Sequence, residues 1–398
     1  MDITIQPGFL EGKITVIPSK SQAHRYLICA AFADGPTRLL CPETNRDMDA
    51  TADCLRALGA EIVKNDWGYS VAPVSAVPRD AELYCRDSGS TLRFLLPVAG
   101  ALGVKAAFHL EGRLPSRPLS PMWEEMERMG CRLSRPTETT ILTEGKLRPG
   151  TYQVDGGVSS QFITGLLFGT SLISGSSRLL ITGTVQSKPY IDMTLKAMEV
   201  FGRKIRDFQI SGGEYFHSPG TLSVEGDWSN GAFFLAANSL GSHLQIEGLD
   251  PCSCQGDRAA AHLLENLSGC PTISGADIPD LVPILSVAAA CRDGAVFTDI
   301  GRLRLKESDR VQSVTDMICA LGGKARATAQ TLEIFGTGLT GGTVDADNDH
   351  RIAMSAAIAA TVCRQPVTIL GAQCVCKSYP GFWEEYRRLG GNYEQYIR

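Results

Sequence analysis

The densest group of chemically useful side chains lies at residues 302–310, which read Arg-Leu-Arg-Leu-Lys-Glu-Ser-Asp-Arg. The first four residues alternate between arginine and leucine, which predicts a short strand, and the stretch from Lys306 is typical of the first turn of a helix. The free backbone N–H groups and dipole of such a turn favour an anion, and Lys306 and Arg310 would share one helical face. A carboxylate held among these cations, such as Glu307, stays ionised but can pass a proton when a substrate changes its surroundings. A solvated helix start has the same composition, so the interpretation depends on whether such turns recur.

Turns of this kind do recur along the chain. Each one joins hydroxyl, glycine or cationic residues to the start of an apolar helical segment, a combination that suits phosphate or carboxylate groups. The residues of interest are Lys20, Ser21, Arg25, Gly89, Arg113, Ser159, Ser160, Gln161, Ser187, Arg351 and Lys377. Ordinary helix caps and surface turns remain the alternative for each motif taken alone. Together, the motifs predict a cleft for a pair of substrates that carry several negative charges.

Two further polar residues need their own interpretation. Asp280 is a lone carboxylate just before the apolar run at residues 284–290, and an acid there is costly unless it is paired or functional. Function and helix capping both remain open for it. His24, inside the first of the recurring turns, is interpreted as a polar surface residue.

Composition narrows the class of protein. A chain of 398 residues with 43% hydrophobic and 20% charged residues predicts a soluble globular protein of two domains. The net charge of −5 argues against a general binder of nucleic acids or acidic membranes. No run approaches ~18 apolar residues, and the start lacks a signal-peptide pattern, so we expect no membrane partner. The 13 cysteines are scattered without Cys-x-x-Cys spacing, which favours reduced thiols in the cytoplasm and no metal site.

A helix-like segment that ends in an apolar residue and a glycine occurs six times, which indicates a repeated unit. The six glycines are Gly59, Gly130, Gly202, Gly269, Gly322 and Gly390. Two short alternating strands follow four of them: Glu61–Val63 with Tyr69–Val71, Arg132–Leu133 with Thr140–Leu142, Lys204–Ile205 with Thr221–Val224, and Lys324–Ala327 with Thr331–Ile334. The chain after Gly269 leaves little room for such a pair, so we expect the fifth unit, which carries Asp280, to lack most of its hairpin. Six units rich in strands and helices, three in each of two domains, are the natural architecture.

These motifs resemble those of one known family. The motifs Pro18–Arg25, Ser159–Gln161, Ser187–Thr194, Arg304–Arg310, Asp349–Met354 and Lys377–Pro380 occur in the order found in 5-enolpyruvylshikimate-3-phosphate (EPSP) synthases. The resemblance implies an α/β fold, a two-domain, inside-out, barrel-like arrangement of six βαβαββ-type repeats with three per domain. It places residues 1–18 and 226–398 in one domain and 19–225 in the other, with the active site in the interdomain cleft.

The same resemblance implies an activity in the shikimate pathway to chorismate and aromatic amino acids. The enolpyruvyl group of phosphoenolpyruvate moves to the 5-hydroxyl of shikimate 3-phosphate, and phosphate leaves by addition–elimination through a tetrahedral intermediate. The resemblance implies no cofactor and these two small molecules as partners, and we expect a monomer in the cytoplasm. Shikimate 3-phosphate would contact Lys20, Ser21, Arg25, Ser159, Ser160, Gln161, Ser187, Asp280 and Lys306. Phosphoenolpyruvate would contact Lys20, Gly89, Arg113, Gln161, Arg310, Arg351 and Lys377.

Two acid–base groups are required by this chemistry. A proton must reach the methylene carbon of phosphoenolpyruvate, and another must leave the attacking hydroxyl. Asp280 and Glu307 are the carboxylates in the matching motifs. We expect Asp280 to be the base towards the hydroxyl, Glu307 to be the proton donor to the methylene carbon, and Lys20 to assist.

Several positions depart from the family pattern. Arg86-Asp87 stands where Gly-Asn is common, and Arg302 stands where some members have an asparagine that touches the shikimate phosphate. Gly89 is retained, which in this family is associated with sensitivity to glyphosate.

Two alternative functions remain. The first is a UDP-N-acetylglucosamine enolpyruvyl transferase, and the second is an inactive anion-binding homologue. The first carries a reactive cysteine in the loop corresponding to Gly112–Pro118, whereas no cysteine lies between Cys85 and Cys131 here.

Overall fold

The structure, a computed structural model, describes residues 1–396. The chain divides into two compact units, Pro18–Val224 and Met1–Ile17 with Glu225–Arg398. Both divisions fall one residue before those expected from the sequence. We call Pro18–Val224 the middle unit and the other the terminal unit, because the latter contains both ends of the chain.

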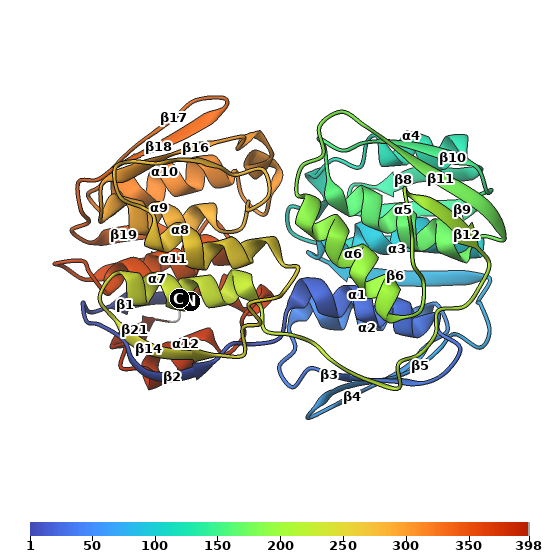
Figure 1. The fold of residues 1–398 in the computed structure, drawn as a ribbon, viewed down its shortest axis with the longest axis horizontal. Coiled ribbons are helices and arrows are strands. Elements are labelled where there is room, and N and C mark those ends of the chain that lie inside the picture. The colour runs from blue at the N-terminus through green and yellow to red at the C-terminus, as the bar shows by residue number, and fades with distance from the viewer. Residues whose placement is uncertain (397–398) are drawn as a thin grey trace. The chain divides into compact units, whose positions relative to one another are not determined.

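The middle unit consists of three sheets and the helices between them, coloured blue to yellow-green in Figure 1. Its helices are α1 (Lys20–Ala31), α2 (Arg46–Ala57), α3 (Gly89–Leu102), η1 (Leu114–Ser116), α4 (Met122–Arg128), α5 (Ser160–Leu172) and α6 (Lys188–Val200). Its strands are β3 (Thr37–Leu40), β4 (Glu61–Asn65), β5 (Gly68–Ala72), β6 (Asp80–Arg86), β7 (Lys105–Leu110), β8 (Cys131–Thr137), β9 (Thr140–Gly145), β10 (Thr151–Asp155), β11 (Gly175–Thr182), β12 (Gln209–Gly212) and β13 (Thr221–Ser223). The sheets have the orders β13-β3-β5-β4, β6-β7-β9-β8 and β10-β11-β12.

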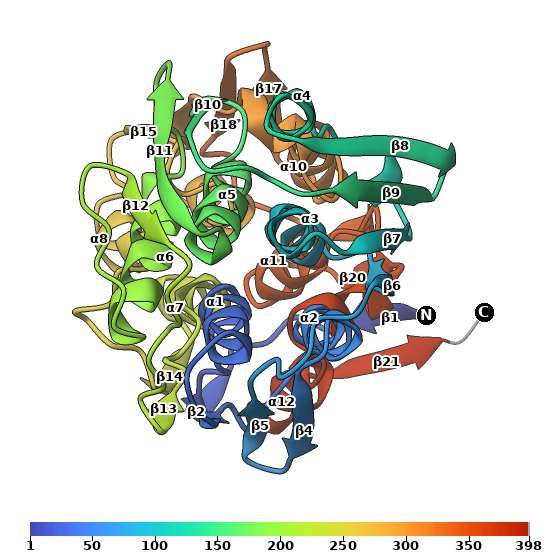
Figure 2. The ribbon, with the colours of Figure 1, turned by 90° about the vertical axis from the view of Figure 1, so that its right-hand side faces the viewer.

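Helices α1, α3 and α5 form the centre of the middle unit. Nearly every residue of the three is buried, and α3 and α5 are apolar on all sides, as expected of helices enclosed by other elements. Figure 2 shows the three sheets of this unit around the outside of these helices. Because parallel strands need a crossover connection, α3 links β6 to β7 and α5 links β10 to β11. The first residues of these helices therefore follow directly from the ends of strands.

The terminal unit has the same kind of architecture. Its helices are α7 (Trp228–Ser239), η2 (Gly256–Arg258), α8 (Ala259–Glu265), α9 (Val282–Ala290), η3 (Gly301–Leu305), α10 (Arg310–Ala320), α11 (His350–Ala360), η4 (Ala372–Lys377) and α12 (Phe382–Arg388). Its strands are β1 (Asp2–Ile5), β2 (Glu11–Thr15), β14 (His243–Glu247), β15 (Thr272–Ser274), β16 (Gly294–Thr298), β17 (Lys324–Ala327), β18 (Thr331–Phe335), β19 (Gly342–Asp345), β20 (Val367–Leu370) and β21 (Tyr393–Tyr396). The sheets have the orders β14-β2, β15-β16-β18-β17 and β19-β20-β1-β21, and α9 and α11 are entirely buried.

One repeat is shortened, but it is not the one that carries Asp280. The chain after α8 enters β15 without forming a hairpin, which agrees with the shortage of residues after Gly269. The missing hairpin belongs to the repeat of α7 and α8, whose sheet is only the β14-β2 pair. The sheet beside Asp280, β15-β16-β18-β17, is complete. The expectation that the repeat of Asp280 has lost its hairpin is therefore wrong.

The six repeat glycines have the conformation expected of helix stops. Their φ angles are positive, from 72° to 116°, a region that costs other residues steric strain. The strands predicted after four of them are present, except that Lys204–Ile205 is irregular and the strand forms at β12 instead.

The local structure at residues 302–310 differs from the sequence prediction. The predicted strand is the 3₁₀ helix η3, and α10 begins only at Arg310, with Asp309 as its N-cap. Lys306 is therefore outside the helix, and it does not share a helical face with Arg310. The alternation of arginine and leucine did not lead to a strand, because η3 buries only Leu303. A single buried residue does not require the alternating faces of a strand.

Candidate active site

A buried cluster of charged groups lies at the start of α10 in the terminal unit. Arg310 is almost completely buried, with 1% of its surface exposed. Its Nη1 donates to Asp280 Oδ1 at 2.7 Å, and its Nη2 donates to Glu307 Oε2 at 2.8 Å. Its Nε donates to Asp349 Oδ2 at 2.9 Å. One guanidinium group therefore fixes three carboxylates, a geometry that its planar fork of donors allows and a lysine would not.

Asp280, which precedes α9, receives two more cations. Lys306 Nζ lies 3.5 Å from its Oδ1, and Arg351 Nη2 lies 3.5 Å from its Oδ2. Burial opposes the charge of Asp280, but Lys306, Arg351 and Arg310 outweigh it and hold its pKa well below the ordinary range. Asp280 is therefore ionised, which a proton acceptor must be.

Lys306 and Glu307 occupy the turn between η3 and α10. Burial lowers the pKa of Lys306, against the opposing charge of Asp280, so this ammonium group gives up its proton more readily than an exposed lysine does. Glu307 is about one quarter exposed and reaches Arg310 from three residues away. Both predicted residues therefore join the cluster around Asp280.

Asp349 is a member of the cluster whose role the sequence did not reveal. Its carboxylate is fully buried and caps α11, with Oδ1 accepting from the backbone N–H of Arg351 at 2.9 Å. Its Oδ2 accepts from Ser308 Oγ at 3.1 Å as well as from Arg310. An aspartate just before a predicted helix indicated a helix cap. Its contact with Arg310 could not be predicted, because that contact depends on the tertiary structure.

Arg351 keeps unused hydrogen-bonding capacity. It is 3% exposed, and its guanidinium lies 5.8 Å from the ring centre of Phe233. Within residues 1–396, its Nε and Nη1 atoms have no hydrogen-bond partner. Because an unsatisfied buried donor is costly, these atoms mark a place where an anion would be stabilised.

Lys377 lies at the end of η4, apart from the Asp280 cluster. Its Nζ donates to the backbone oxygen of Asn348 at 2.9 Å, next to Asp349. It is therefore placed near the start of α11, as Arg351 is.

In the middle unit, the start of α1 carries Lys20. Its Nζ forms an ion pair with Asp47 Oδ2 at 3.0 Å, and both side chains are mostly buried. The helix is capped by Ser19, whose side chain accepts from the N–H of Gln22. Ser21, next to Lys20, contributes its backbone oxygen to Arg25 at 2.6 Å.

The start of α3 forms a small cationic cradle. A Cβ atom on Gly89 would lie 2.6 Å from Arg93 Nη1 and 2.9 Å from Arg117 Nη1, so a larger residue there would push the two guanidinium groups away from the helix start. Arg93 Nη1 donates to Gln161 Oε1 at 3.3 Å, and Gln161 Nε2 donates to Ser90 Oγ at 3.0 Å. Two arginines beside a helix N-terminus suit a phosphate or carboxylate.

The structure places Arg113 elsewhere. Arg113 precedes η1 and is exposed, whereas Arg117, after that turn, reaches Gly89. The short 3₁₀ turn η1 lies between the two arginines, so that Arg117 and not Arg113 faces α3 in this structure, and the contact of Arg113 with phosphoenolpyruvate stays a prediction. Arg93 was also missed, although its position one turn into α3 was a usable signal.

Two predicted residues, Arg25 and Ser187, are buried close to α6. Arg25 is 2% exposed, and its three nitrogen atoms donate to Thr194 Oγ1, to the backbone oxygen of Ser21 and to that of Tyr190. It therefore ties α1 to α6. Ser187, just before α6, is buried and has a positive φ of 55°.

Ser159 and Ser160 lie at the start of α5. Ser159 is the N-cap of this helix and accepts from the N–H of Gln161 at 3.2 Å, and Ser160 is buried. These residues place Gln161 beside the cradle at α3.

Asp257 in η2 is a buried acid that the sequence did not single out. Its Oδ2 accepts from Ser229 Oγ, and its Oδ1 has no hydrogen-bond partner within the described residues. Burial, reinforced by the charge of Asp280, raises the pKa of Asp257 to about 7. It lies within electrostatic reach of Arg351 as well, so its ionisation is linked to the charges of the site.

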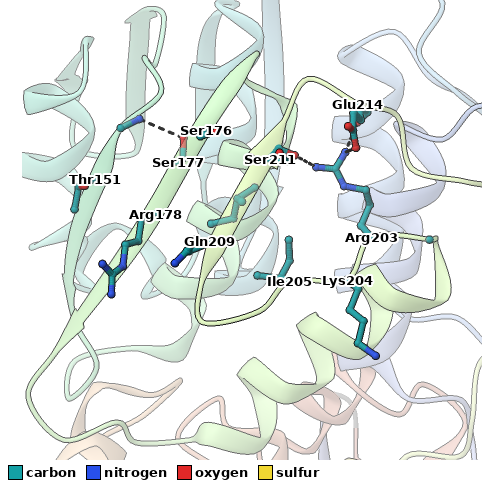
Figure 3. Close-up of a pocket in the computed structure, with 13 residues that line it drawn as sticks. Thr151, Ser176, Ser177, Arg178, Arg203, Lys204, Ile205, Gln209, Ser211 and Glu214 are labelled. Carbon is teal, nitrogen blue, oxygen red and sulfur yellow. Dashed lines mark hydrogen bonds and ion pairs between the residues drawn. The ribbon is translucent and has the colours of Figure 1, made fainter.

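The middle unit also has an open cavity of about 680 Å³ away from these residues, shown in Figure 3. Arg203 in its wall donates to the backbone oxygens of Ser211 and Glu214, and Lys204 pairs with Glu199. The charges of Arg203 and Lys204 are therefore held by groups of the middle unit itself. The cavity is not part of the candidate site.

No helix among residues 1–396 combines the length and apolar character needed to cross a membrane. The fold and the site together define a class of protein: a two-unit α/β protein with cationic helix starts for anionic substrates and paired carboxylates for acid–base chemistry.

The chain belongs to the EPSP synthase (3-phosphoshikimate 1-carboxyvinyltransferase) family, whose family model matches residues 5–275 and 271–386. The 3-phosphoshikimate 1-carboxyvinyltransferase of Clostridium kluyveri is 37% identical over 420 residues, covering 99% of this chain and 98% of that protein. The protein of the same name from Clostridium beijerinckii is 35% identical over 430 residues, covering 99% of both. The predicted family is confirmed.

Solved structures agree on the fold. Two structures of EPSP synthase from Acinetobacter baumannii align with TM-scores of 0.79 and 0.80 at 23% and 22% identity, covering 99% and 100% of this chain and 100% of each of those chains. At this identity the likeness concerns the fold, and it confirms the predicted α/β class.

Proposed function

We propose that this chain transfers the enolpyruvyl group of phosphoenolpyruvate to the 5-hydroxyl of shikimate 3-phosphate and releases phosphate, as a transferase of the shikimate pathway. The observation that carries the proposal is the identity of 37% over 99% of the chain to an enzyme with the corresponding name. The cluster of Asp280, Glu307 and Arg310 supports it, because it places two carboxylates, which the acid–base steps require, on one guanidinium group.

Phosphoenolpyruvate binds to the cationic helix starts. The cradle of Gly89, Arg93 and Arg117 takes its phosphate, with Gln161 and Lys20 beside it. Arg351 offers its two unused donors to the carboxylate, and Lys377 adds a positive charge near the same helix start. Arg117 replaces Arg113 in this assignment, because its guanidinium lies against α3.

Shikimate 3-phosphate binds to the serine-rich helix starts. Ser159, Ser160 and Gln161 at α5 supply hydroxyl and amide groups for its phosphate and ring hydroxyls. Ser21 and Ser187 extend this surface, and Arg25 holds α1 against α6 beneath it. Asp280 and Lys306 contact the hydroxyl that reacts.

The acid–base steps use the two carboxylates of the Asp280 cluster. Glu307, once protonated, gives a proton to the methylene carbon while the 5-hydroxyl oxygen attacks the adjacent carbon and loses its proton to Asp280. In the second half, the bond from that carbon to the phosphate oxygen breaks, phosphate leaves with the proton from Asp280, and Glu307 takes back a proton from the new methyl group. Lys20 stabilises negative charge on the departing phosphate. Both carboxylates return to their starting states, so no cofactor or metal is consumed.

Arg310 links substrate binding to these steps. Its guanidinium nitrogens are occupied by three carboxylates in this structure. For phosphoenolpyruvate to bind Arg310, its carboxylate replaces that of Glu307. Loss of the cation favours the protonated form of Glu307, which the first step requires.

An assay of phosphate release tests the proposal. Phosphoenolpyruvate is supplied with shikimate 3-phosphate in one reaction and with UDP-N-acetylglucosamine in the other. Turnover with the first acceptor alone is expected. Turnover with only the second would assign the chain to the other enolpyruvyl transferase, and none with either would indicate an inactive homologue.

The proposal includes a monomer that acts in the cytoplasm on small molecules without nucleic acid. Light scattering of the purified protein across a range of concentrations measures the oligomeric state. A mass twice that of the chain would contradict the monomer.

A further inference from the structure

A chain of buried hydrogen bonds crosses the middle unit from α1 to α3. His24 Nδ1 lies 2.7 Å from Thr51 Oγ1, and Thr51 Oγ1 lies 2.7 Å from Thr91 Oγ1. Thr91 Oγ1 donates to Ser88 Oγ at 2.7 Å. All four side chains have no exposed surface, so the expectation that His24 is a surface residue is wrong.

The bond from Thr91 to Ser88 sets a direction for the other two hydrogen bonds, because Thr91 is the donor there. Thr91 has one hydroxyl proton, which goes to Ser88 Oγ or to the more distant backbone oxygen of Asp47 at 3.5 Å. Thr91 can therefore only accept from Thr51, and Thr51, with its proton spent, can only accept from His24. His24 Nδ1 must carry a proton, and when the ring is neutral its Nε2 is unprotonated. Burial and the nearby charges of Lys20 and Arg25 lower the pKa of His24, which keeps the ring neutral.

The series of hydrogen bonds ends at two helix starts that the proposed function assigns to anion binding. Ser88 is the N-cap of α3 and accepts from the N–H of Thr91 at 3.3 Å, directly before Gly89. His24 lies one helical turn after Lys20 in α1. Thr51 belongs to α2, whose first turn contains Asp47, the partner of Lys20. The hydrogen bonds therefore connect α1, which carries Lys20, to α3, which begins at Gly89, through α2.

We propose that His24 is a positioning residue, whose Nδ1–H bond through Thr51 and Thr91 holds the N-cap of α3 at a fixed spacing from Lys20. This inference rests on the proposed function, in which both helix starts bind phosphoenolpyruvate. The chain of hydrogen bonds acts on the substrate only through Ser88 and the backbone of α3, so its loss weakens binding of phosphoenolpyruvate more than binding of shikimate 3-phosphate. A role in stability alone would predict no such difference.

The first test is the tautomer of His24, measured by two-dimensional NMR of the ¹⁵N-labelled protein at neutral pH. The proposal requires an Nδ1 shift typical of a protonated nitrogen and an Nε2 shift typical of an unprotonated one. The opposite pattern, or a doubly protonated ring, would overturn it. This measurement does not depend on turnover, so it stands apart from the proposed function.

The second test compares three variants by steady-state kinetics. Thr51→Val removes the hydroxyl at nearly constant volume and should raise KM for phosphoenolpyruvate about fivefold, with kcat and KM for shikimate 3-phosphate within about twofold of wild type. Thr51→Ser keeps a hydroxyl and should restore KM. Thr170→Val is the matched control, because the buried Thr170 hydroxyl bonds only to backbone oxygens of its own helix.

Equal KM values in Thr51→Val and wild type would overturn the inference, even if the variant melts at a lower temperature. If Thr51→Val does not fold, two variants of His24 replace it. The amide of His24→Asn reaches the position of Nδ1 and should preserve KM for phosphoenolpyruvate, whereas that of His24→Gln reaches the position of Nε2 and should raise it. Failure of the wild-type protein to turn over would contradict the proposed function, not the tautomer.

Discussion

Arg310 joins three carboxylates from different segments, and this gives single residues unusual influence on the site. Asp349 is fully buried beside it, and Asp280 shares it with Lys306 and Arg351. Removing one charge from such a cluster leaves its partners uncompensated, so the isosteric amide is the informative substitution.

Glu307→Gln should keep substrate binding and lose at least about 100-fold in kcat, because the amide can still accept from Arg310 but cannot deliver a proton. The measurement is kcat and KM from phosphate release. Gln312→Glu, on an exposed face of α10, is a control for a change of one charge nearby. A Glu307→Gln variant with turnover close to wild type would remove Glu307 from the mechanism.

Asp257→Asn should alter the pH dependence of stability. The pKa of Asp257 is raised to about 7 in the folded protein, by burial and by Asp280 and Asp227, against the opposing effects of Ser229 and Arg351. Between about pH 4 and pH 7, the unfolded chain has lost this proton and the folded chain has kept it, so stability falls as pH rises. The amide keeps the bond with Ser229 and avoids the buried charge.

Urea unfolding of wild type and Asp257→Asn at pH 5 and pH 8 measures the difference. The variant should gain stability relative to wild type at pH 8, by on the order of 2–4 kcal/mol, and should be close to it at pH 5. Substitution of the exposed Asp250 by asparagine is the control. The same gap between wild type and variant at both pH values would show that Asp257 does not titrate in this range.

At the scale of elements, the site depends on where helices begin. Ser19, Ser88, Ser159 and Asp349 cap α1, α3, α5 and α11, and each cap precedes a residue assigned to the site. The sequence was informative here, because serine or aspartate before an apolar helical run is a reliable start signal. It was less exact at α10, where η3 delays the start to Arg310, and it did not indicate that η1 would turn Arg117 towards α3.

Arg117→Ala should raise KM for phosphoenolpyruvate by about 10- to 100-fold, because a charge-assisted bond to an anion is lost. Arg113→Ala, in the same loop and with an exposed side chain, is the matched control and should change KM less than about twofold. Steady-state kinetics at saturating shikimate 3-phosphate would separate the two. Equal losses in both variants would mean that the loop rearranges when substrate binds.

At the scale of the whole molecule, the repeat of six glycines predicted the α/β class and the order of most elements. It could do so because each repeat has a helix that ends at a glycine with a positive φ, and these glycines recur visibly in the sequence. Contacts between distant residues were out of reach: no local pattern indicates that Arg310 meets Asp349, that Asp257 is buried beside Ser229, or that His24 lies in a core. These contacts depend on how repeats pack, which spacing along one segment does not encode.

Removal of residues 391–398 should unfold the terminal unit and spare the middle one. Strand β21 covers one edge of β1, and Ile3 and Ile5 of β1 are fully buried. Hydrogen exchange followed by mass spectrometry should show loss of protection at residues 1–17 and 225–390, with protection retained at residues 18–224. Replacement of β17 and β18 by a glycine linker is the control, because it removes two strands from another sheet of the same unit and leaves β1 and β21 in place. Retained protection of β1 in the shortened chain would contradict the prediction.

The sheet order β19-β20-β1-β21 has a consequence for how this protein is made. Strand β1 has no neighbour in its sheet until β20 has been synthesised, about 360 residues later (Ile5 to Val367). All strands of the middle unit, by contrast, are complete once β13 has paired with β3. The middle unit can therefore fold while β1 is still unpaired, which makes β1 the natural client of a chaperone until β20 is synthesised.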